Sequence, residues 1–214
     1  MSELTGIILS AGFSRRMKAF KPLVLYRGLP FLLQILQKLA PVCRELRVVT
    51  GYRSEELQSQ TRQLLLQLAE ENRPGNRWLE VRKKIRFIYN PQYPFGMFSS
   101  LKAGISQLSP DSAILYHQVD QPHIPDAFYA ELARQYQPEI DWLQPVFQGI
   151  PGHPVILGAR VLDAVRKAAP NANLRQIKIE NHFHILNFET GYQQILSDFD
   201  FPNDLREEAT NEDL

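Results

Sequence analysis

Small residues and two cations follow the first apolar run of the chain, and together they could hold a phosphate group. The stretch Ser10-Ala11-Gly12 comes directly after the apolar residues 5–9, and Arg16 and Lys21 stand a few positions further on. Small side chains let backbone N–H groups approach an anion closely. If that phosphate belonged to a triphosphate, fixed cations beside the loop would stabilise the negative charge that builds on pyrophosphate as it leaves. The spacing matches neither a P-loop nor a G-x-G-x-x-G dinucleotide motif, so both of those classes are excluded.

One carboxylate, that of Asp120, follows a later apolar run and is a candidate metal ligand. Ligands of an open α/β sheet gather at the carboxyl ends of its strands, which is where Asp120 would lie. Mg²⁺ takes one or two carboxylates together with phosphate oxygens. An Asp-x-Pro sequence is also a common turn, and one carboxylate alone would hold the ion poorly. The position after an apolar strand favours metal binding.

The elements that must position these residues are predicted from the alternation of apolar runs with stretches of helical period. Strands are expected at residues 5–9, 46–50, 85–89, 113–119, 143–147 and 155–157. Helices are expected at residues 30–39, 54–71, 99–108, 125–136 and 159–168. Such alternation indicates βαβ units and an α/β fold with a mostly parallel sheet covered on both faces. We expect one domain over residues 1–206 and an acidic tail over residues 207–214.

Composition excludes several classes of protein. Lysine and arginine number 24 and aspartate and glutamate 23, so no overall field would draw the chain onto nucleic acid or an anionic membrane. The basic stretch at residues 70–84 is predicted to be a solvated connection, because Trp78 is its only large aromatic residue. The single cysteine, Cys43, is expected in a helical stretch and excludes a disulfide framework. We expect a cytoplasmic monomer or weak homodimer with no membrane span.

The loop after the first strand resembles the signature A-G-x-S-x-R-M-G-x-x-K. This is the signature of the nucleotidyltransferases related to molybdenum cofactor cytidylyltransferase and to the guanylyltransferase that makes molybdopterin guanine dinucleotide. The matching residues are Ala11, Gly12, Ser14, Arg16, Met17 and Lys21. Lys18 departs from the pattern, since it stands where the family has glycine. The resemblance implies a Rossmann-like three-layer α/β/α sandwich with a mostly parallel mixed sheet, of the nucleotide-diphospho-sugar transferase type.

Further segments carry the resemblance along the chain. Val119-Asp120-Gln121-Pro122 resembles the family's G-D-Q-P, whose aspartate binds magnesium. Asp198-Phe199-Asp200-Phe201-Pro202 resembles the closing D-I-D-T-P, which makes Asp200 the second expected Mg²⁺ ligand. Gly152-His153-Pro154-Val155 resembles G-H-P-V on the acceptor side, so His153 is either an acceptor contact or a histidine satisfied by backbone partners.

The resemblance also marks the residues expected to border the nucleotide. Segments 48–51 and 96–101 resemble nucleotide-bordering stretches of the family, and Asn90 is either a turn residue or a nucleotide contact. The expected set is Leu9, Ser10, Ala11, Gly12, Ser14, Thr50, Gly51, Asn90, Gly96, Ser99 and Ser100.

The activity that the resemblance implies is magnesium-dependent transfer of a nucleoside monophosphate from an NTP to a phosphorylated small molecule, with release of pyrophosphate. Lys21 and Arg16 would be the catalytic cations. The loop Ser10-Ala11-Gly12 is nearer to the family's cytidine-transferring A-A-G than to A-G-G, so CTP is the first choice of donor and molybdopterin the first choice of acceptor. A sugar phosphate or another small phosphate is an alternative acceptor. Departures at Lys18, Val119, Pro151 and Phe201 leave open a nucleotide-binding homologue without turnover.

Overall fold

The computed structural model describes residues 4–70, 76–169 and 171–205. The strands are β1 (Leu4–Ser10), β2 (Leu25–Tyr26), β3 (Leu29–Pro30), β4 (Cys43–Thr50), β5 (Ile85–Tyr89), β6 (Ile114–Gln118), β7 (Trp142–Phe147), β8 (Ile150–Pro151), β9 (Val155–Leu157) and β10 (Ile185–Glu189). The α-helices are α1 (Phe31–Leu39), α2 (Ser54–Glu70), α3 (Arg77–Lys84), α4 (Met97–Gly104), α5 (Asp126–Gln135), α6 (Ala159–Lys167) and α7 (Leu174–Glu180). Within these ranges no helix has the length and apolar character needed to cross a bilayer.

Eight strands of the described chain form one mixed sheet in the order β10-β7-β9-β6-β1-β4-β5, with β8 paired to β7. β1 pairs in parallel with both β4 and β6, while β9 pairs antiparallel to β6 and β7. The strand order therefore reverses at β1, because the chain builds one side of the sheet through β4 and the other through β6. A crevice outside the carboxyl ends of the strands is expected at such a reversal.

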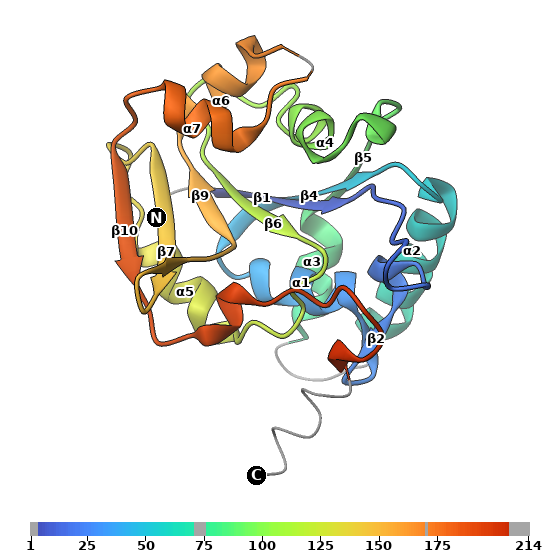
Figure 1. Ribbon diagram of the computed structural model, residues 1–214. Coiled ribbons are helices and arrows are strands. Elements are labelled where there is room, and N and C mark those ends of the chain that lie inside the picture. The colour runs from blue at the N-terminus through green and yellow to red at the C-terminus, as the bar shows by residue number, and fades with distance from the viewer. Residues whose placement is uncertain (1–3, 71–75, 170, 206–214) are drawn as a thin grey trace.

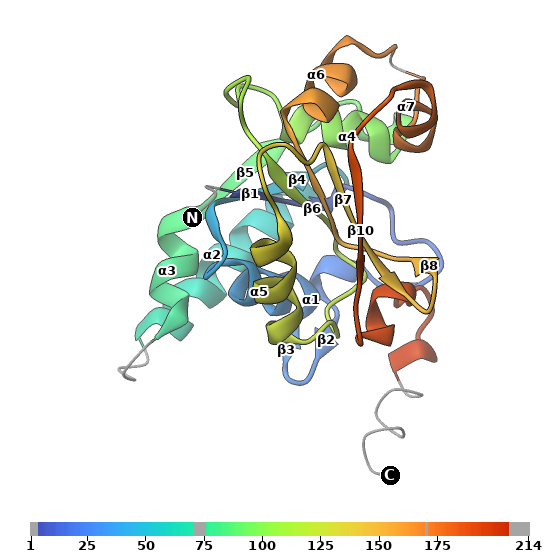
Figure 2. The ribbon, with the colours of Figure 1, turned by 90° about the vertical axis from the view of Figure 1, so that its left-hand side faces the viewer.

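Helices cover both faces of the sheet. Figure 1 shows α4, α6 and α7 above the strands and α1, α2, α3 and α5 below them, and Figure 2 shows the same layers after a quarter turn. The buried apolar residues accordingly fall into two clusters, one on each face of the sheet. The expected three-layer α/β/α sandwich with a mostly parallel mixed sheet is confirmed.

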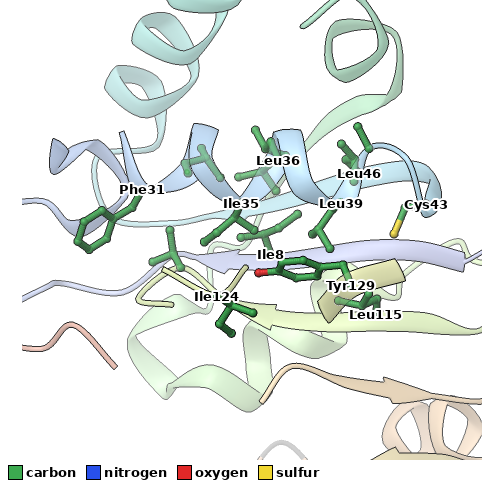
Figure 3. Packing of buried hydrophobic residues seen from close by; sticks show 14 of the residues in the cluster. Ile8, Phe31, Ile35, Leu36, Leu39, Cys43, Leu46, Leu115, Ile124 and Tyr129 are labelled. Atoms are coloured by element: carbon green, nitrogen blue, oxygen red, sulfur yellow. The ribbon is translucent and has the colours of Figure 1, made fainter. Parts of the chain in front are cut away.

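The larger cluster shows why α1 forms where it does. Its sequence FLLQILQKL is apolar along nearly all its length, and a helix of that kind is stable only when buried. Figure 3 shows Leu36 and Leu39 of α1 above Ile8 of β1 and Leu115 of β6, with Tyr129 of α5 on the same side of the sheet. Pro30, which lacks an N–H, precedes the first helical residue.

Two sequence expectations are wrong. Cys43 is the first residue of β4 and not part of a helix; it is a buried free thiol, and burial raises its pKa to about 12. The stretch predicted as a solvated connection contains α3, which Asn76 caps by accepting a hydrogen bond from the Trp78 backbone N–H at 3.0 Å. Residues 71–75 of that stretch, and the predicted acidic tail at 207–214, lie outside the described residues.

α7 and β10 have no counterpart in the sequence prediction, because their short apolar runs lack a clear period.

Candidate active site

A cavity of about 310 Å³ opens at the carboxyl ends of β1 and β6. The loop after β1 forms one wall, the start of α4 forms another, and the residues after β6 close it. The expected site residues in its lining are Leu9, Ser10, Ala11, Gly12, Ser14, Arg16, Lys21, Gly96, Ser100 and Asp120. Residues far apart in sequence therefore meet at the point where the strand order reverses.

Local contacts hold the loop after β1 in an open turn. The carbonyl oxygen of Ala11 accepts a hydrogen bond from the Tyr52 N–H at 3.1 Å, and Ser14 Oγ accepts one from the Lys21 N–H at 3.1 Å. Ser14 and Lys18 have φ angles of 54° and 55°. Lys18 thus adopts the left-handed backbone that favours glycine, although it replaces the family's glycine. A lysine at this position therefore does not prevent the left-handed turn that glycine would adopt readily.

The ammonium of Lys21 lies between the two predicted metal ligands. Lys21 Nζ is 3.1 Å from Asp120 Oδ2 and 2.5 Å from Asp200 Oδ1. Arg16 Nη1 lies 2.6 Å from Asp200 Oδ2. The side chain of Lys21 is only 9% exposed, whereas that of Arg16 is 65% exposed. Both predicted catalytic cations and both predicted metal ligands therefore form one ion-pair network, of which Arg16, Lys21 and Asp120 line the cavity and Asp200 lies outside its lining.

Side-chain packing holds the Asp200 segment against the loop that follows β6. The His123 ring stacks on the Phe199 ring with centroids 4.4 Å apart, and His123 Nε2 lies 2.9 Å from Ser197 Oγ. The amide of Gln121 donates to the carbonyl oxygen of Ser197 at 3.3 Å. Lys38 anchors the same loop from below, where its ammonium donates to the carbonyl oxygens of Pro122 and Ile124. These contacts explain how two distant carboxylates converge.

The carboxylates fit the magnesium ion that the resemblance implies. Asp120 Oδ1 is buried and has no hydrogen-bond partner, so one ligand oxygen is available. Loss of hydration, together with the charges of Asp120 and Asp200, raises the pKa of the Asp198 carboxyl to about 6, which marks a locally negative site. Among the described residues no group of three or more His, Cys, Asp or Glu is arranged to hold a metal. Phosphate oxygens would have to complete the coordination.

Four residues expected to border the nucleotide lie outside the cavity lining of the described chain: Thr50, Gly51, Asn90 and Ser99. The Asn90 amide donates to Ser99 Oγ at 3.0 Å and to Ser100 Oγ at 3.1 Å. Ser99 Oγ in turn donates to the carbonyl oxygen of Gly96 at 2.8 Å. The Thr50 hydroxyl lies 2.7 Å from Ser54 Oγ, and Gly51 packs beneath Tyr93. These residues brace the wall that carries Gly96 and Ser100.

His153 also lies outside the cavity lining. Its backbone N–H donates to the carbonyl oxygen of Ile195 at 3.0 Å, and its ring lies edge-on to Tyr116. Its Nδ1 atom is buried and has no hydrogen-bond partner. Burial lowers the pKa of His153, while the nearby Asp120 opposes that shift. The charge of Asp120 therefore influences the His153 ring. A contact between His153 and an acceptor stays a prediction.

Comparison with known proteins identifies the family of this chain. Residues 6–183 match the model of the MobA-like NTP transferase domain, a span that includes the loop after β1 and Asp120. The chain belongs to this family. Across 95% of its length it is 25% identical to molybdenum cofactor cytidylyltransferase of Escherichia coli, of which 94% is covered.

Solved structures share the fold of this MobA-like transferase at lower identity. A nucleotidyl transferase from Methanothermobacter superposes with a TM-score of 0.73 at 18% identity, covering 99% of this chain and 98% of that one. The manganese complex of a Mycobacterium tuberculosis protein superposes with a TM-score of 0.60 at 16% identity, covering 88% of each chain.

The MobA-like domain also contains cavity residues that the sequence analysis did not select. Tyr93 and Met97 line the cavity, and Phe13 lies between Tyr93 and Tyr52 with ring centroids 5.3 Å from each. Met97 is 60% exposed although it is apolar. The sequence did contain a signal for this, namely the aromatic residue Phe13 within a loop of small residues, because a nucleotide base can stack on an aromatic ring.

Proposed function

We propose that this MobA-like transferase transfers CMP from CTP to a phosphorylated small molecule, with molybdopterin as the first candidate acceptor, and releases pyrophosphate. The observation that carries the proposal is one cavity at the strand reversal that is lined by a small-residue loop, by Arg16 and Lys21 and by Asp120, with Asp200 ion-paired to both cations. A triphosphate needs the loop and the cations, while the carboxylates are suited to a divalent ion.

The residues of the chain would act by positioning and by electrostatics. Backbone N–H groups of Ala11 and Gly12 would bind the triphosphate, and Lys21 and Arg16 would stabilise the charge that accumulates on pyrophosphate as its bond to the α-phosphorus breaks. A phosphate oxygen of the acceptor would attack that phosphorus from the opposite side. A phosphate dianion is already a nucleophile at neutral pH, so no general base is required. A divalent ion bound by Asp120 and Asp200 would supply further charge neutralisation on the phosphate oxygens.

Two observations support the choice of donor and metal. The loop carries Ala11, as cytidine-transferring relatives tend to, and the Escherichia coli relative is a cytidylyltransferase. A structural relative was crystallised with manganese, which supports a divalent metal, and we propose Mg²⁺ as the ion used. The left-handed backbone of Lys18 is one that glycine would adopt readily, so the substitution does not require a different loop, which favours a working phosphate loop over a degenerate one.

Pyrophosphate release tests the proposal. The purified protein is incubated with each of the four NTPs, with and without Mg²⁺, and with molybdopterin, sugar 1-phosphates or methylerythritol phosphate as acceptor. We expect release with CTP, molybdopterin and Mg²⁺. Release with a different acceptor would reassign the acceptor, and a calorimetric preference for GTP would reverse the choice of donor. Nucleotide binding without release over the whole panel would indicate a binding homologue.

A further inference from the structure

Lys21 and Arg16 engage three of the four carboxylate oxygens of Asp120 and Asp200. Lys21 contacts Asp120 Oδ2 and Asp200 Oδ1, and Arg16 contacts Asp200 Oδ2. Asp120 Oδ1 alone has no hydrogen-bond partner. Both oxygens of Asp200 are therefore taken by protein cations, while Asp120 keeps one oxygen free.

This arrangement has a physical reason. Asp120 and Asp200 are only 17% and 19% exposed, so their like charges repel in a poorly hydrated setting unless a cation lies between them. The Lys21 ammonium, itself 9% exposed, supplies that cation. A divalent ion that uses both carboxylates competes with Lys21 and Arg16 for the oxygens of Asp200. Lys21 is the more buried of these two cations, and it alone of the two contacts both carboxylates.

We propose that Lys21 is an internal competitor of the divalent metal, which it holds off until an NTP is bound. The triphosphate offers the Lys21 ammonium another set of anionic oxygens, so NTP binding frees Asp200 for the metal. Metal and NTP then bind with positive coupling, and by linkage each tightens the other by the same factor. This inference rests on the proposed nucleotide and metal sites.

Manganese affinity of the nucleotide-free protein tests the competition without any turnover. Mn²⁺ binding is followed by electron paramagnetic resonance for the wild type and for Lys21→Met, which keeps most of the length of the side chain and removes its charge. We expect Lys21→Met to bind Mn²⁺ roughly tenfold more tightly, within the range usual for coupled sites. Equal or weaker binding by Lys21→Met would overturn the competition.

Lys18→Met is the matched control. It removes one positive charge from the same loop, but the described structure shows no ion pair between Lys18 and either carboxylate. Its Mn²⁺ affinity is expected to stay within about twofold of the wild type, since an exposed charge at a distance is screened by salt. An equal gain in both variants would assign the effect to net charge and would also overturn the proposal.

A second measurement uses only the wild type, in case Lys21→Met does not fold. Acetylation of Lys21 by an amine-reactive reagent is quantified by mass spectrometry with and without Mn²⁺, with Lys18 as internal reference. Mn²⁺ alone should speed acetylation of Lys21 severalfold by releasing its ammonium from the carboxylates. Unchanged or slower acetylation would contradict the competition. Failure of every NTP to bind in calorimetry would overturn the proposed function instead, so the two failures are distinguishable.

Discussion

The backbone N–H of Phe199 donates a hydrogen bond to the carbonyl oxygen of Asp120 at 2.8 Å. This bond joins the segment that carries Asp200 to the loop that follows β6, in which Asp120 lies. Because the bond is between backbone atoms, it fixes the backbone of the Asp200 segment beside that of Asp120, and the side-chain rotamers then set the distance between the two carboxylates. The buried Phe199 ring, stacked on His123 and packed edge-on to Tyr26, keeps the segment from detaching.

Replacement of Asp120 by asparagine should greatly reduce metal-dependent turnover and leave the fold intact. The amide keeps the size of the side chain but removes the charge that a divalent ion needs. We expect pyrophosphate release to fall by roughly a hundredfold or more, the scale for loss of one preorganised electrostatic group. Thermal melting would verify that Asp120→Asn is folded. Full activity in the folded variant would refute the metal assignment.

A side chain at Gly12 should block the nucleotide without disturbing the protein. A Cβ atom at Gly12 would meet no atom within 4 Å, whereas one at Gly51 would lie 2.5 Å from Tyr93 Cβ. Gly12→Val should therefore lose NTP affinity in calorimetry at an unchanged melting temperature. Gly51→Val should instead lose about 1–3 kcal/mol of stability through overpacking. Unchanged NTP affinity in Gly12→Val would remove this loop from the nucleotide site.

Loss of Lys21 should fall mainly on the rate of transfer. The ammonium would neutralise the leaving pyrophosphate more strongly in the transition state than in the ground state. We expect Lys21→Ala to lower kcat by roughly a hundredfold or more while NTP affinity weakens less. Lys18→Ala should be milder, because Lys18 does not line the cavity of the described chain. A larger loss at Lys18 would show that the register assigned to the loop is wrong.

Glycine at position 18 should stabilise the protein. Lys18 has a φ of 55°, a left-handed conformation that costs a residue with a Cβ atom roughly 1–2 kcal/mol relative to glycine. Glycine also loses more backbone entropy on folding, so we expect Lys18→Gly to gain about 0.5–1 kcal/mol. Urea unfolding would measure the gain. A loss of stability would mean that contacts of the Lys18 side chain add more to the free energy of unfolding than its left-handed backbone subtracts.

Acid should destabilise the fold through two buried histidines. Burial lowers the pKa of His117 to about 3 and that of His123 to about 4, from an ordinary 6.5. Between pH 6.5 and about 4 the unfolded chain binds a proton on each that the folded chain does not. The free energy of unfolding should therefore fall as the pH falls, by about 1.4 kcal/mol per pH unit for each histidine. His123→Asn should reduce this slope by that amount in urea unfolding, and an unchanged slope would argue against a neutral His123.

Much of the fold and part of the site could be predicted from the sequence because their signals are local. β5 and β9 have the predicted bounds, since short runs rich in β-branched and aromatic residues between turn residues are typical of strands. The loop from Ser10 to Lys21 was predicted to bind an anion from its small residues and cations alone. Lys18, by contrast, shows that a residue type does not settle its backbone conformation, because this lysine has a φ of 55°, in the region that favours glycine.

Long-range packing determines how the site residues lie relative to one another. The sequence identified Lys21, Asp120 and Asp200 as separate candidates, but only the tertiary structure places the Lys21 ammonium between both carboxylates. It also turns Asn90 onto the serines of α4 and away from the cavity lining. Such contacts depend on the direction of each side chain and on distances across the sheet. Both are set by how β1, β6 and the Phe199 segment pack together, and no local pattern of residues records that packing.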